Sequence, residues 1–450
     1  MNPDPPVYLW PDPEALGPVT DLYQLTMMAG FIAIGRDRDR ASFELFIRRL
    51  PKNRVYLVFA GLEQAIGDLL RLRFSSEQVE EIRRWPIFRT IAPPFFEALE
   101  SFRFEGDVWS VPEGTVVFPG ETLLRVEADL PHAQLVETFL LSSLGYPTLV
   151  ASKAARIVGA AAGRPVYEFG ARRGHGPHAG FLAARSSYIA GFAGTSHVEA
   201  ARRLGIPAFG TMAHSWVQAF VTEAEAFEAF AQVIPGATML LVDTYDTLAG
   251  VRQAAAIEPA VRAIRLDSGD PLELSYRSRA ILDELGRHEV KIFASGDLDE
   301  FEIARLVRHE APIDAFGVGT ELITSKDAPA LSLVYKLVEL NGVGRIKLSP
   351  SKRTYPMAKQ VFRSRDATGR FAGDHVTCAD ESAEGEPLLV PVVREGKLVA
   401  PLPGLDAIRD HCRAQLESLP DRLREPEAEP DYAISYSDAL EAEADRLGLQ

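Results

Sequence analysis

The sequence predicts an α/β protein in which an irregular seven-stranded (β/α) barrel packs beside a discontinuous α+β accessory domain built from both chain ends. Between about residues 150 and 325, short apolar runs alternate with amphipathic segments of helical spacing. Nearly every run ends in polar residues or glycine, which is typical of strand ends at the active face of a barrel. The flanking segments have shorter β-like runs, and neither flank shows a core of its own.

Seven apolar runs are the expected strands of the barrel. Strands that alternate with helices indicate a parallel sheet. Seven runs favour an irregular barrel, although an open doubly wound sheet would produce a similar pattern. The runs cover residues 166–169, 191–195, 208–212, 239–242, 263–266, 291–294 and 315–318.

The two flanks are expected to form one composite domain. Residues 22–34 and 57–72 have helical spacing, whereas residues 42–48 and 388–393 resemble strands. Because neither flank is self-sufficient, the economical arrangement packs them together beside the barrel. The resulting boundaries are 1–150 and 341–450 for the accessory domain and 151–340 for the barrel.

Composition narrows the class of protein. The chain has 450 residues, 46% of them hydrophobic, and its 63 acidic and 48 basic side chains give a net charge of −15. This charge argues against nucleic acid or an anionic membrane as the main partner, so an anionic substrate needs local positive groups. Cys378 and Cys412 form neither a zinc set nor a disulfide framework, and no apolar stretch is long enough to span a bilayer. We therefore expect a cytoplasmic protein.

The most informative segment is Arg265-Leu266-Asp267-Ser268-Gly269-Asp270-Pro271. Strand alternation places Arg265 and Asp267 on the same face, at the end of an otherwise apolar strand. Burial of two charges for packing alone would be costly. Asp270-Pro271 then begins a helix, so the pair lies at a strand's carboxyl end, where α/β folds place their chemistry.

Other strand ends supply carboxylates, hydroxyls and glycines. Asp243-Thr244-Tyr245-Asp246 follows the fourth run, and this oxygen-rich set suits Mg²⁺ bridging to phosphates. The backbone amides of Gly296, Gly319 and Thr320 follow the sixth and seventh runs and suit a phosphate. A glycine after one strand usually marks only a turn. Four polar strand ends in barrel order are stronger evidence for a site.

Three further residues are candidates for binding or catalysis, although each could instead have a purely structural role. Phe169 and Arg172 follow the first run and could hold a flat anionic ring by stacking and charge pairing. Equally, Phe169 could belong to the core and Arg172 to the solvated surface. A lone histidine is usually structural, but His214 follows the third run and faces the expected carboxylates, so it is a candidate base or phosphoryl acceptor.

Five motifs together resemble the nicotinate phosphoribosyltransferase family, and they occur in the family's order over roughly residues 18–365. The resemblance implies a type II phosphoribosyltransferase fold, assembled as a homodimer with shared active sites. It also implies that nicotinate and phosphoribosyl pyrophosphate give nicotinate mononucleotide and pyrophosphate, coupled to ATP hydrolysis through a phosphorylated histidine, in NAD biosynthesis or salvage. The motifs lie at residues 20–27, 168–173, 210–215, 265–269 and 316–320.

The resemblance implies a ring pocket. Phe169 would stack on one face of the pyridine ring, while Tyr23 of the partner subunit would cover the other, with Asp21 beside it. Aromatic faces also favour the pyridinium product through cation–π attraction. Arg172 and Arg265 would bind anionic groups of the ligands, with Arg265 pairing with the carboxylate.

The resemblance also implies residues for metal and phosphate. Asp246 and Asp267 would hold Mg²⁺, directly or through water. His214 would be the phosphorylated residue, with the adjacent Ser215 also binding substrate. The 5′-phosphate would bind at Gly296, Gly319 and Thr320.

Ser196 distinguishes the acid from the amide substrate. Nicotinamide-using relatives resemble this chain but have an aspartate at the position of Ser196, which would accept from an amide and repel a carboxylate. Serine removes that repulsion and favours nicotinate. Two departures from the family pattern are Met357-Ala358, where Pro-Gly is usual, and His175, where glutamine is usual.

Three alternative functions remain on the sequence alone. The first is quinolinate or nicotinamide phosphoribosyl transfer on the same fold. The second is a barrel lyase or isomerase, but no lysine ends any of the seven runs to form a Schiff base. The third is a binding protein without turnover.

Overall fold

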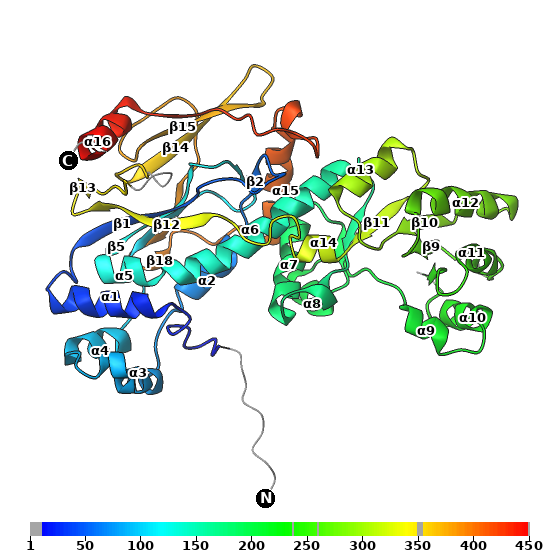
Figure 1. The fold of residues 1–450 in the computed structure, drawn as a ribbon, viewed down its shortest axis with the longest axis horizontal. Coiled ribbons are helices and arrows are strands. Elements are labelled where there is room, and N and C mark those ends of the chain that lie inside the picture. Colours follow the sequence, from blue (N-terminus) through cyan, green and yellow to red (C-terminus); the bar gives the residue numbers. More distant parts are fainter. Residues whose placement is uncertain (1–10, 236–237, 259–260, 349–353, 449–450) are drawn as a thin grey trace, which may run out of the picture.

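The fold is organised around two sheets that are linked by the long helix α6 (Glu137–Ala160). A computed structural model describes residues 11–235, 238–258, 261–348 and 354–448. An antiparallel sheet and its helices form one side of the molecule, and a parallel sheet and its helices form the other (Figure 1).

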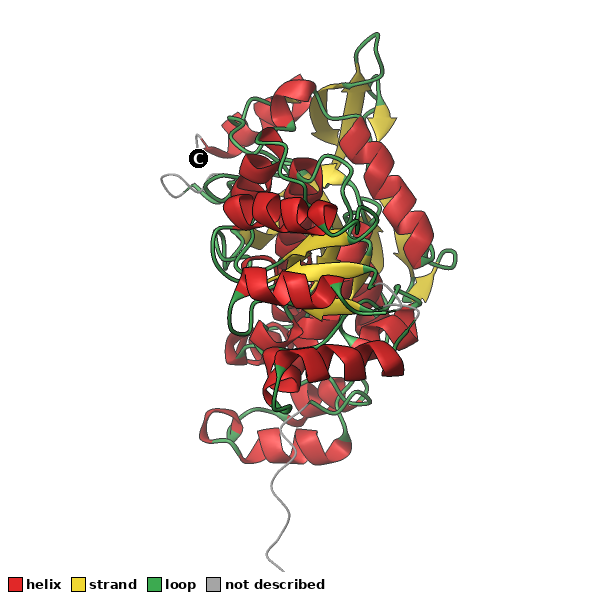
Figure 2. Cartoon of the chain, turned by 90° about the vertical axis from the view of Figure 1, so that its right-hand side faces the viewer, coloured by secondary structure: helices red, strands yellow, loops and turns green. Residues whose placement is uncertain are grey.

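The parallel sheet has six strands in the order β7-β6-β11-β10-β9-β8. Seen from its own side of the molecule, the sheet lies in the centre with helices around it (Figure 2). Asp270 accepts a hydrogen bond from the Leu272 amide and so caps α12, which agrees with the predicted Asp-Pro helix start. The strands are β6 (Val166–Glu168), β7 (Gly194–Thr195), β8 (Met239–Leu241), β9 (Ala263–Leu266), β10 (Lys291–Ala294) and β11 (Ala315–Val318). The helices are α7 (Pro177–Ile189), α8 (Val198–Leu204), α9 (His214–Gln218), α10 (Glu223–Val233), α11 (Thr247–Ala255), α12 (Pro271–Glu284), α13 (Glu300–Arg308) and α14 (Thr320–Ile323).

The parallel α/β arrangement is confirmed, but the closed seven-stranded barrel is not. Six of the seven runs form strands, whereas residues 208–212 contribute one isolated bridge, between Ala208 and Thr195. On its other side this segment reaches β8 through the Thr211 hydroxyl, which donates to the Met239 carbonyl. The segment begins after Pro207, which has no amide hydrogen to donate, and it lines a cavity on one face. The described strands therefore form a half-barrel.

The antiparallel sheet combines strands from distant parts of the sequence, in the order β13-β12-β1-β5-β3-β17-β18. The interior strand β1 pairs with β12 on one side and β5 on the other. Lys336 lies on β12, whose residues Tyr335, Val338 and Leu340 are buried in the sheet's core. The strands are β1 (Arg40–Ile47), β3 (Asp107–Ser110), β5 (Thr122–Asp129), β12 (Leu333–Leu340), β13 (Val343–Gly344), β17 (Val390–Arg394) and β18 (Lys397–Leu398). Its associated helices are α1 (Leu22–Ala33), α2 (Leu62–Leu69), α3 (Ser76–Arg84), α4 (Pro93–Glu100) and α5 (Leu130–Leu135).

Two smaller sheets complete the fold, and they have the orders β16-β14-β15-β19 and β2-β4. Met357, just before β14, takes a φ of +65°, whereas Ala358 does not adopt a left-handed conformation, so the backbone strain falls on the methionine. The remaining elements are β2 (Leu57–Val58), β4 (Val116–Val117), β14 (Lys359–Arg365), β15 (Phe371–Cys378), β16 (Glu386–Pro387), β19 (Ile434–Tyr436), α15 (Leu405–Glu417) and α16 (Asp438–Gly448).

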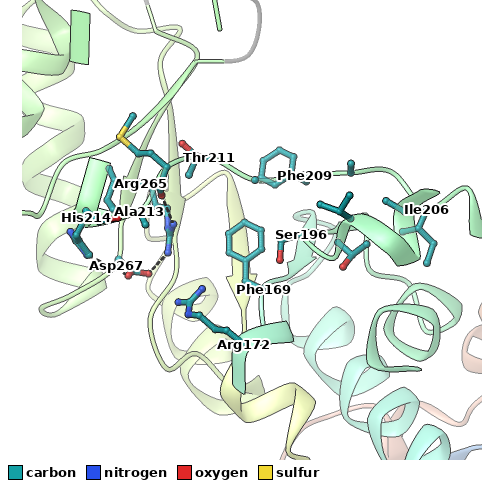
Figure 3. A pocket seen from close by; sticks show the side chains of 18 of the residues that line it. Phe169, Arg172, Ser196, Ile206, Phe209, Thr211, Ala213, His214, Arg265 and Asp267 are labelled. Carbon is teal, nitrogen blue, oxygen red and sulfur yellow. Dashed lines mark hydrogen bonds and ion pairs between the residues drawn. The ribbon is translucent and has the colours of Figure 1, made fainter. Parts of the chain in front are cut away.

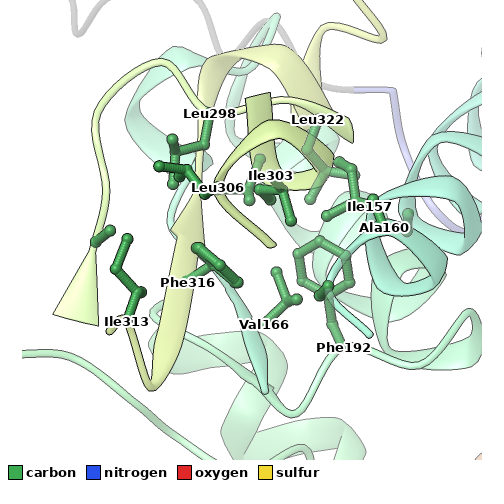
Figure 4. Close-up of a cluster of buried hydrophobic side chains, with 14 of the residues drawn as sticks. Ile157, Ala160, Val166, Phe192, Leu298, Ile303, Leu306, Ile313, Phe316 and Leu322 are labelled. Carbon is green, nitrogen blue, oxygen red and sulfur yellow. The ribbon is translucent and has the colours of Figure 1, made fainter. Parts of the chain in front are cut away.

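Hydrophobic packing holds the parallel sheet against its helices. Val166 on β6 and Phe316 on β11 are neighbours in register, and both are buried. Their side chains meet Ile157 from α6 and Leu306 from α13 in one cluster (Figure 4). This packing fixes the strands whose carboxyl ends form the site described below.

A buried ionic network ties α6 to the segments that follow β10 and β11. The ammonium of Lys153 lies 2.7 Å from Glu300, the first residue of α13, and 3.0 Å from Asp327, which follows α14. Arg156 pairs with Glu300 at 3.0 Å, and Arg54 pairs with Asp327 at 2.8 Å. Because each charge has a partner, burial is tolerated, and the network sets both strand ends relative to α6.

Removal of one charge from this network should destabilise the fold. Asp327→Ala leaves Arg54 and Lys153 short of a partner, so we expect the free energy of unfolding to fall by about 3 kcal/mol in urea titrations. Asp410→Ala removes an exposed pair with Arg413 and should cost less than about 1 kcal/mol. Equal effects of the two variants would contradict the role of the network.

The same variant should have a characteristic pH dependence. Burial raises the pKa of Asp327, but Arg54 and Lys153 outweigh burial and hold it well below its usual range. A lowered carboxyl pKa stabilises the fold above the ordinary carboxyl value and loses this contribution as the pH falls through the folded-state value. The difference in unfolding free energy between wild type and Asp327→Ala should therefore become smaller as the pH is lowered.

Candidate active site

A cavity of about 980 Å³ lies at the carboxyl ends of the parallel strands (Figure 3). Its walls come from the ends of β6, β7 and β9 and from the segment 206–215, which the half-barrel leaves without a full strand ladder. The structure brings seven predicted site residues to this one cavity, namely Phe169, Arg172, Ser196, His214, Ser215, Arg265 and Asp267.

The oppositely charged side chains of Arg265 and Asp267, at the end of β9, form the centre of the site. The Arg265 Nη2 atom lies 2.6 Å from Asp267 Oδ1, and Arg265 Nε donates to the Ser295 hydroxyl at 2.8 Å. Ser295 in turn donates to Asp267 Oδ1 at 2.6 Å. Burial raises the pKa of Asp267, but Arg265, Ser295 and His214 outweigh burial and lower it below its usual value. Asp267 is thus held as a carboxylate.

His214 faces this carboxylate from α9. Its Nε2 atom lies 3.7 Å from Asp267 Oδ2, and its Nδ1 atom lies 3.1 Å from the Thr244 hydroxyl. The side chain is 40% exposed, so the imidazole is open to the cavity while Thr244 sets its orientation. Each ring nitrogen therefore has a neighbour, Nδ1 the Thr244 hydroxyl and Nε2 the more distant Asp267 carboxylate, and the ring lines the cavity.

The fourth strand end contributes Asp243 rather than Asp246 to the contacts with Asp267. Asp243 Oδ2 accepts from the Asp267 amide at 3.1 Å and from the Ser268 hydroxyl, while its buried Oδ1 has no hydrogen-bond partner among the described residues. Asp246 lies three residues further on, and its exposed carboxylate caps α11 by accepting from the Ala249 amide at 2.8 Å. Sequence reasoning did not single out Asp243, although it is the residue nearest to the strand end.

The acidic side of the site is electrostatically suited to a cation. Burial, followed by the charges of Asp243 and Asp246, raises the pKa of Glu223 to about 7. Its buried Oε1 also has no hydrogen-bond partner in the described part of the chain. The described residues contain no group of three or more side chains that could hold a metal ion by themselves. Such a donor set fits Mg²⁺, which usually binds one or two carboxylates together with substrate phosphates.

Aromatic rings form the opposite wall. The Phe169 ring is near-parallel to those of Phe209 and Phe293, with centroids 6.2 and 5.6 Å away. The Arg265 guanidinium carbon lies 5.5 Å from the Phe169 ring centroid. Ser196 and Arg172 lie at the exposed edge beside Phe169 (Figure 3). The site therefore has a flat apolar face with guanidinium groups at its border. Phe209 was not identified from the sequence because its run was assigned to a regular strand.

Glu168 positions this wall from behind. Its buried carboxylate accepts from the Thr195 hydroxyl at 2.6 Å and from the Gly170 amide, and its carbonyl accepts from the Ser196 amide at 2.9 Å. Burial raises the pKa of Glu168, while these donors favour its charged form. One side chain thus links the loop after β6 to the loop after β7.

The glycine-bearing strand ends lie next to the cavity but do not line it. Gly296 has a φ of +89°, and an added Cβ would lie 2.1 Å from the Asp267 carbonyl oxygen, so only glycine fits. Gly319 and Thr320 lie where β11 leads into α14. Because β10 and β11 are neighbours, these backbone amides share one edge of the sheet.

Asp21 and Tyr23 are not brought to the cavity by their own chain. Both lie at the start of α1, on the side of the antiparallel sheet (Figure 1). Asp21 accepts from the Thr138 hydroxyl at 2.7 Å, and Tyr23, 47% exposed, donates to Glu137 at 3.4 Å. Lys336 lies 3.6 Å from the same Glu137 carboxylate. These residues form a separate polar surface.

The fold and site define an α/β enzyme class in which charged groups meet the substrate at strand carboxyl ends. Models of the nicotinate phosphoribosyltransferase (NAPRTase) N-terminal domain, the NAPRTase family and the nicotinate phosphoribosyltransferase C-terminal domain match residues 19–144, 165–354 and 382–442. The chain therefore belongs to the nicotinate phosphoribosyltransferase family. No helix in the described residues is both long and apolar enough to cross a bilayer.

Individual proteins agree with this assignment. A nicotinate phosphoribosyltransferase of Mycobacterium tuberculosis is 48% identical, covering 95% of this chain and 93% of that protein. A nicotinate phosphoribosyltransferase of Bacillus subtilis is 41% identical, covering 83% of this chain and 78% of that protein. The human nicotinic acid phosphoribosyltransferase crystal structure matches with a TM-score of 0.84 at 29% identity, covering 95% of this chain and 99% of that one. A nicotinate-nucleotide pyrophosphorylase from Pyrococcus furiosus matches with a TM-score of 0.76 at 28% identity, over 91% and 98%.

Loss of the bond between Thr195 and Glu168 should destabilise the protein. Thr195→Val leaves an oxygen of a buried carboxylate without its donor, and we expect a loss of about 2 kcal/mol in unfolding free energy at neutral pH. The donor favours the charged form, so the loss should shrink as acid protonates Glu168. Ser196→Ala, at the neighbouring exposed position, should change stability by less than about 0.5 kcal/mol. A loss in the valine variant that does not vary with pH would contradict this account.

Proposed function

We propose that the protein transfers the phosphoribosyl group of phosphoribosyl pyrophosphate to nicotinate, releasing nicotinate mononucleotide and pyrophosphate, with ATP hydrolysed as a co-substrate. The observation that supports this most strongly is one cavity in which the Phe169 face, the Arg265 guanidinium and the Asp267 carboxylate adjoin. A planar anionic ring needs a flat apolar face and a cation, and a metal-bound sugar diphosphate needs carboxylates for its metal. The cavity offers both. The membership of the chain in the family supports the same reaction.

Phe169 would hold the pyridine ring of nicotinate by stacking. The carboxylate of nicotinate would pair with Arg265, and Arg172 would add positive charge at the rim of the pocket. Ser196 leaves the edge of this pocket uncharged. The bound ring would present its nitrogen toward the acidic side of the cavity, where the sugar diphosphate binds.

The chemistry requires charge stabilisation more than proton transfer. The pyridine nitrogen has a free lone pair and attacks the anomeric carbon as the bond to pyrophosphate breaks, so no general base is needed. Asp267, with Asp243 beside it and Asp246 through water, would hold Mg²⁺, which when bound supplies positive charge to the leaving pyrophosphate. Arg265 keeps Asp267 ionised and oriented for this task. The amides of Gly296, Gly319 and Thr320 would bind the 5′-phosphate.

ATP would act through His214. The Thr244 contact to Nδ1 leaves Nε2 facing the cavity, where it would attack the γ-phosphorus of ATP and release ADP. Hydrolysis of the phosphohistidine would return the imidazole and inorganic phosphate. Ser215, next in the chain and exposed at the cavity, would contact the nucleotide.

A second copy of the chain would complete the ring pocket. Phe169 covers only one face of a bound ring, and Asp21 and Tyr23 form a polar surface far from their own cavity (Figure 1). A homodimer in which α1 of one subunit meets the cavity of the other would bring the partner's Tyr23 to the uncovered face. We also propose that the protein acts in the cytoplasm.

Turnover measurements test the proposed reaction. The protein is incubated with phosphoribosyl pyrophosphate, Mg²⁺ and nicotinate, nicotinamide or quinolinate, with and without ATP, and the mononucleotide is quantified. We expect product from nicotinate, more of it with ATP, and none when EDTA removes Mg²⁺. Preferential turnover of nicotinamide or quinolinate would reject the proposal.

A charge at position 196 should act on the substrate rather than on the fold. Ser196→Asp places a carboxylate beside that of nicotinate, and we expect the KM for nicotinate to rise by about tenfold or more. Ser196→Asn is the matched uncharged variant and should have a smaller effect. Similar KM values for the two variants would show that charge at this position does not select the substrate.

His214→Ala should separate the two chemistries. Without the imidazole we expect no labelling of the protein by γ-³²P-ATP, while transfer from phosphoribosyl pyrophosphate continues at a reduced rate that ATP no longer increases. The exposed His288 offers a control, because His288→Ala should retain full labelling. Undiminished labelling of His214→Ala would place the phosphoryl group on another residue.

A further inference from the structure

A second cavity, of about 360 Å³, lies between helices α6, α7 and α15. We call it the α15 pocket. It shares no lining residue with the candidate active site and lies at the opposite end of β7, because Gly191 precedes that strand while Ser196 follows it. Its volume lies within the range of small-molecule sites. Its apolar walls come from Ala155, Val158, Ile189, Leu416 and Leu419.

Tyr56 gives this pocket an unused hydrogen-bonding group. The side chain lines the cavity and is 5% exposed, and its hydroxyl has no hydrogen-bond partner among the described residues. Burial raises the pKa of Tyr56 to about 12, so the hydroxyl remains a donor at neutral pH. The hydroxyl is not one of the fully buried polar atoms that lack a partner, so it keeps some contact with solvent, and a ligand that supplies an acceptor would replace water there.

Arg409 on α15 gives the pocket a fixed positive charge. Its guanidinium donates to the backbone carbonyls of Phe192 at 2.7 Å, Gly191 at 3.1 Å and Tyr188, and it lies 4.3 Å from the Tyr188 ring centroid. No carboxylate in the described part of the chain forms an ion pair with it. Carbonyl oxygens orient the group but do not neutralise it, and two of its five N–H donors stay available. Two further arginines, Arg413 and Arg424, and two carboxylates, Asp410 and Glu417, also line the pocket, and Asp410 pairs with Arg413. The charged lining is therefore positive overall, which favours an anion.

We propose that the α15 pocket binds a small, largely apolar carboxylic acid that also carries a hydrogen-bond acceptor. The carboxylate meets Arg409, the apolar body packs against Val158 and Leu416, and the second acceptor receives the hydroxyl of Tyr56. This site is independent of the phosphoribosyl transfer reaction, so either proposal can fail without the other.

Quinoline-6-carboxylate is a suitable probe because it has an apolar body, a carboxylate and a ring nitrogen at the far end. Binding to the full-length protein is measured by calorimetry without nicotinate, because nicotinate also has a carboxylate and a ring nitrogen and would compete for the α15 pocket. The Phe169→Ala variant shows whether the probe binds in the ring pocket instead. We expect one bound probe per chain. The neutral analogue quinoline-6-carboxamide should bind at least about tenfold more weakly, because it lacks the charge that Arg409 recognises.

Variants of the pocket test its location. Gly159 on α6 lines the cavity, and an added Cβ would meet open space there, so Gly159→Leu fills the pocket without backbone strain and should abolish binding. Gly159→Ala is the smaller matched change and should weaken it less. Tyr56→Phe removes only the unpartnered hydroxyl, so we expect an unchanged Tm and an affinity about three- to tenfold lower. The loss should disappear for 2-naphthoate, which lacks the ring nitrogen.

Three results would overturn the proposal. The first is no binding of quinoline-6-carboxylate at millimolar concentration. The second is full binding to Gly159→Leu, which would place the probe elsewhere. The third is loss of binding in Phe169→Ala together with retention in Tyr56→Phe, which would assign the probe to the ring pocket of the active site.

Discussion

The pairing of Arg265 with Asp267 is the interaction on which the site depends. Both charges lie at the end of β9, and each is partly removed from water, so neither would be tolerated there alone. Ser295 contacts both residues from β10 and locks their geometry. The pair thereby converts an apolar strand end into a surface that presents a cation and an anion side by side.

Other buried contacts hold the neighbouring loops in position around this pair. Glu168 joins the loops after β6 and β7, and the network around Lys153 holds the segments after β10 and β11 against α6. Gly296 allows its loop to pass directly over the Asp267 carbonyl. The side chains of Glu168, Lys153 and Glu300 are buried, whereas Gly296 lies at the surface. Arg172 and Ser196 are exposed where they line the cavity, and His214 is partly exposed.

The sequence alone predicted the structure correctly where residues close together in the chain determine it. The spacing of Arg265 and Asp267 placed both on one strand face, and Asp270-Pro271 correctly predicted the start of α12. It was insufficient where distant segments compete. The run at 208–212 has the composition of a strand but only one bridge, whereas residues 333–340 form a full strand because β1 supplies an antiparallel partner from the other end of the chain. Nor could spacing alone rank Asp243 above Asp246, since that ranking requires the position of the Asp267 amide.

The gap in the half-barrel has a mechanical consequence for His214. The segment that leads to it is attached to β7 by one bridge and to β8 by one side-chain bond, so it can shift without breaking a ladder of backbone hydrogen bonds. The proposed phosphoryl transfer through His214 would make use of such freedom of movement. The gap between the edges formed by β7 and β8 thus lies along the segment that leads directly to His214.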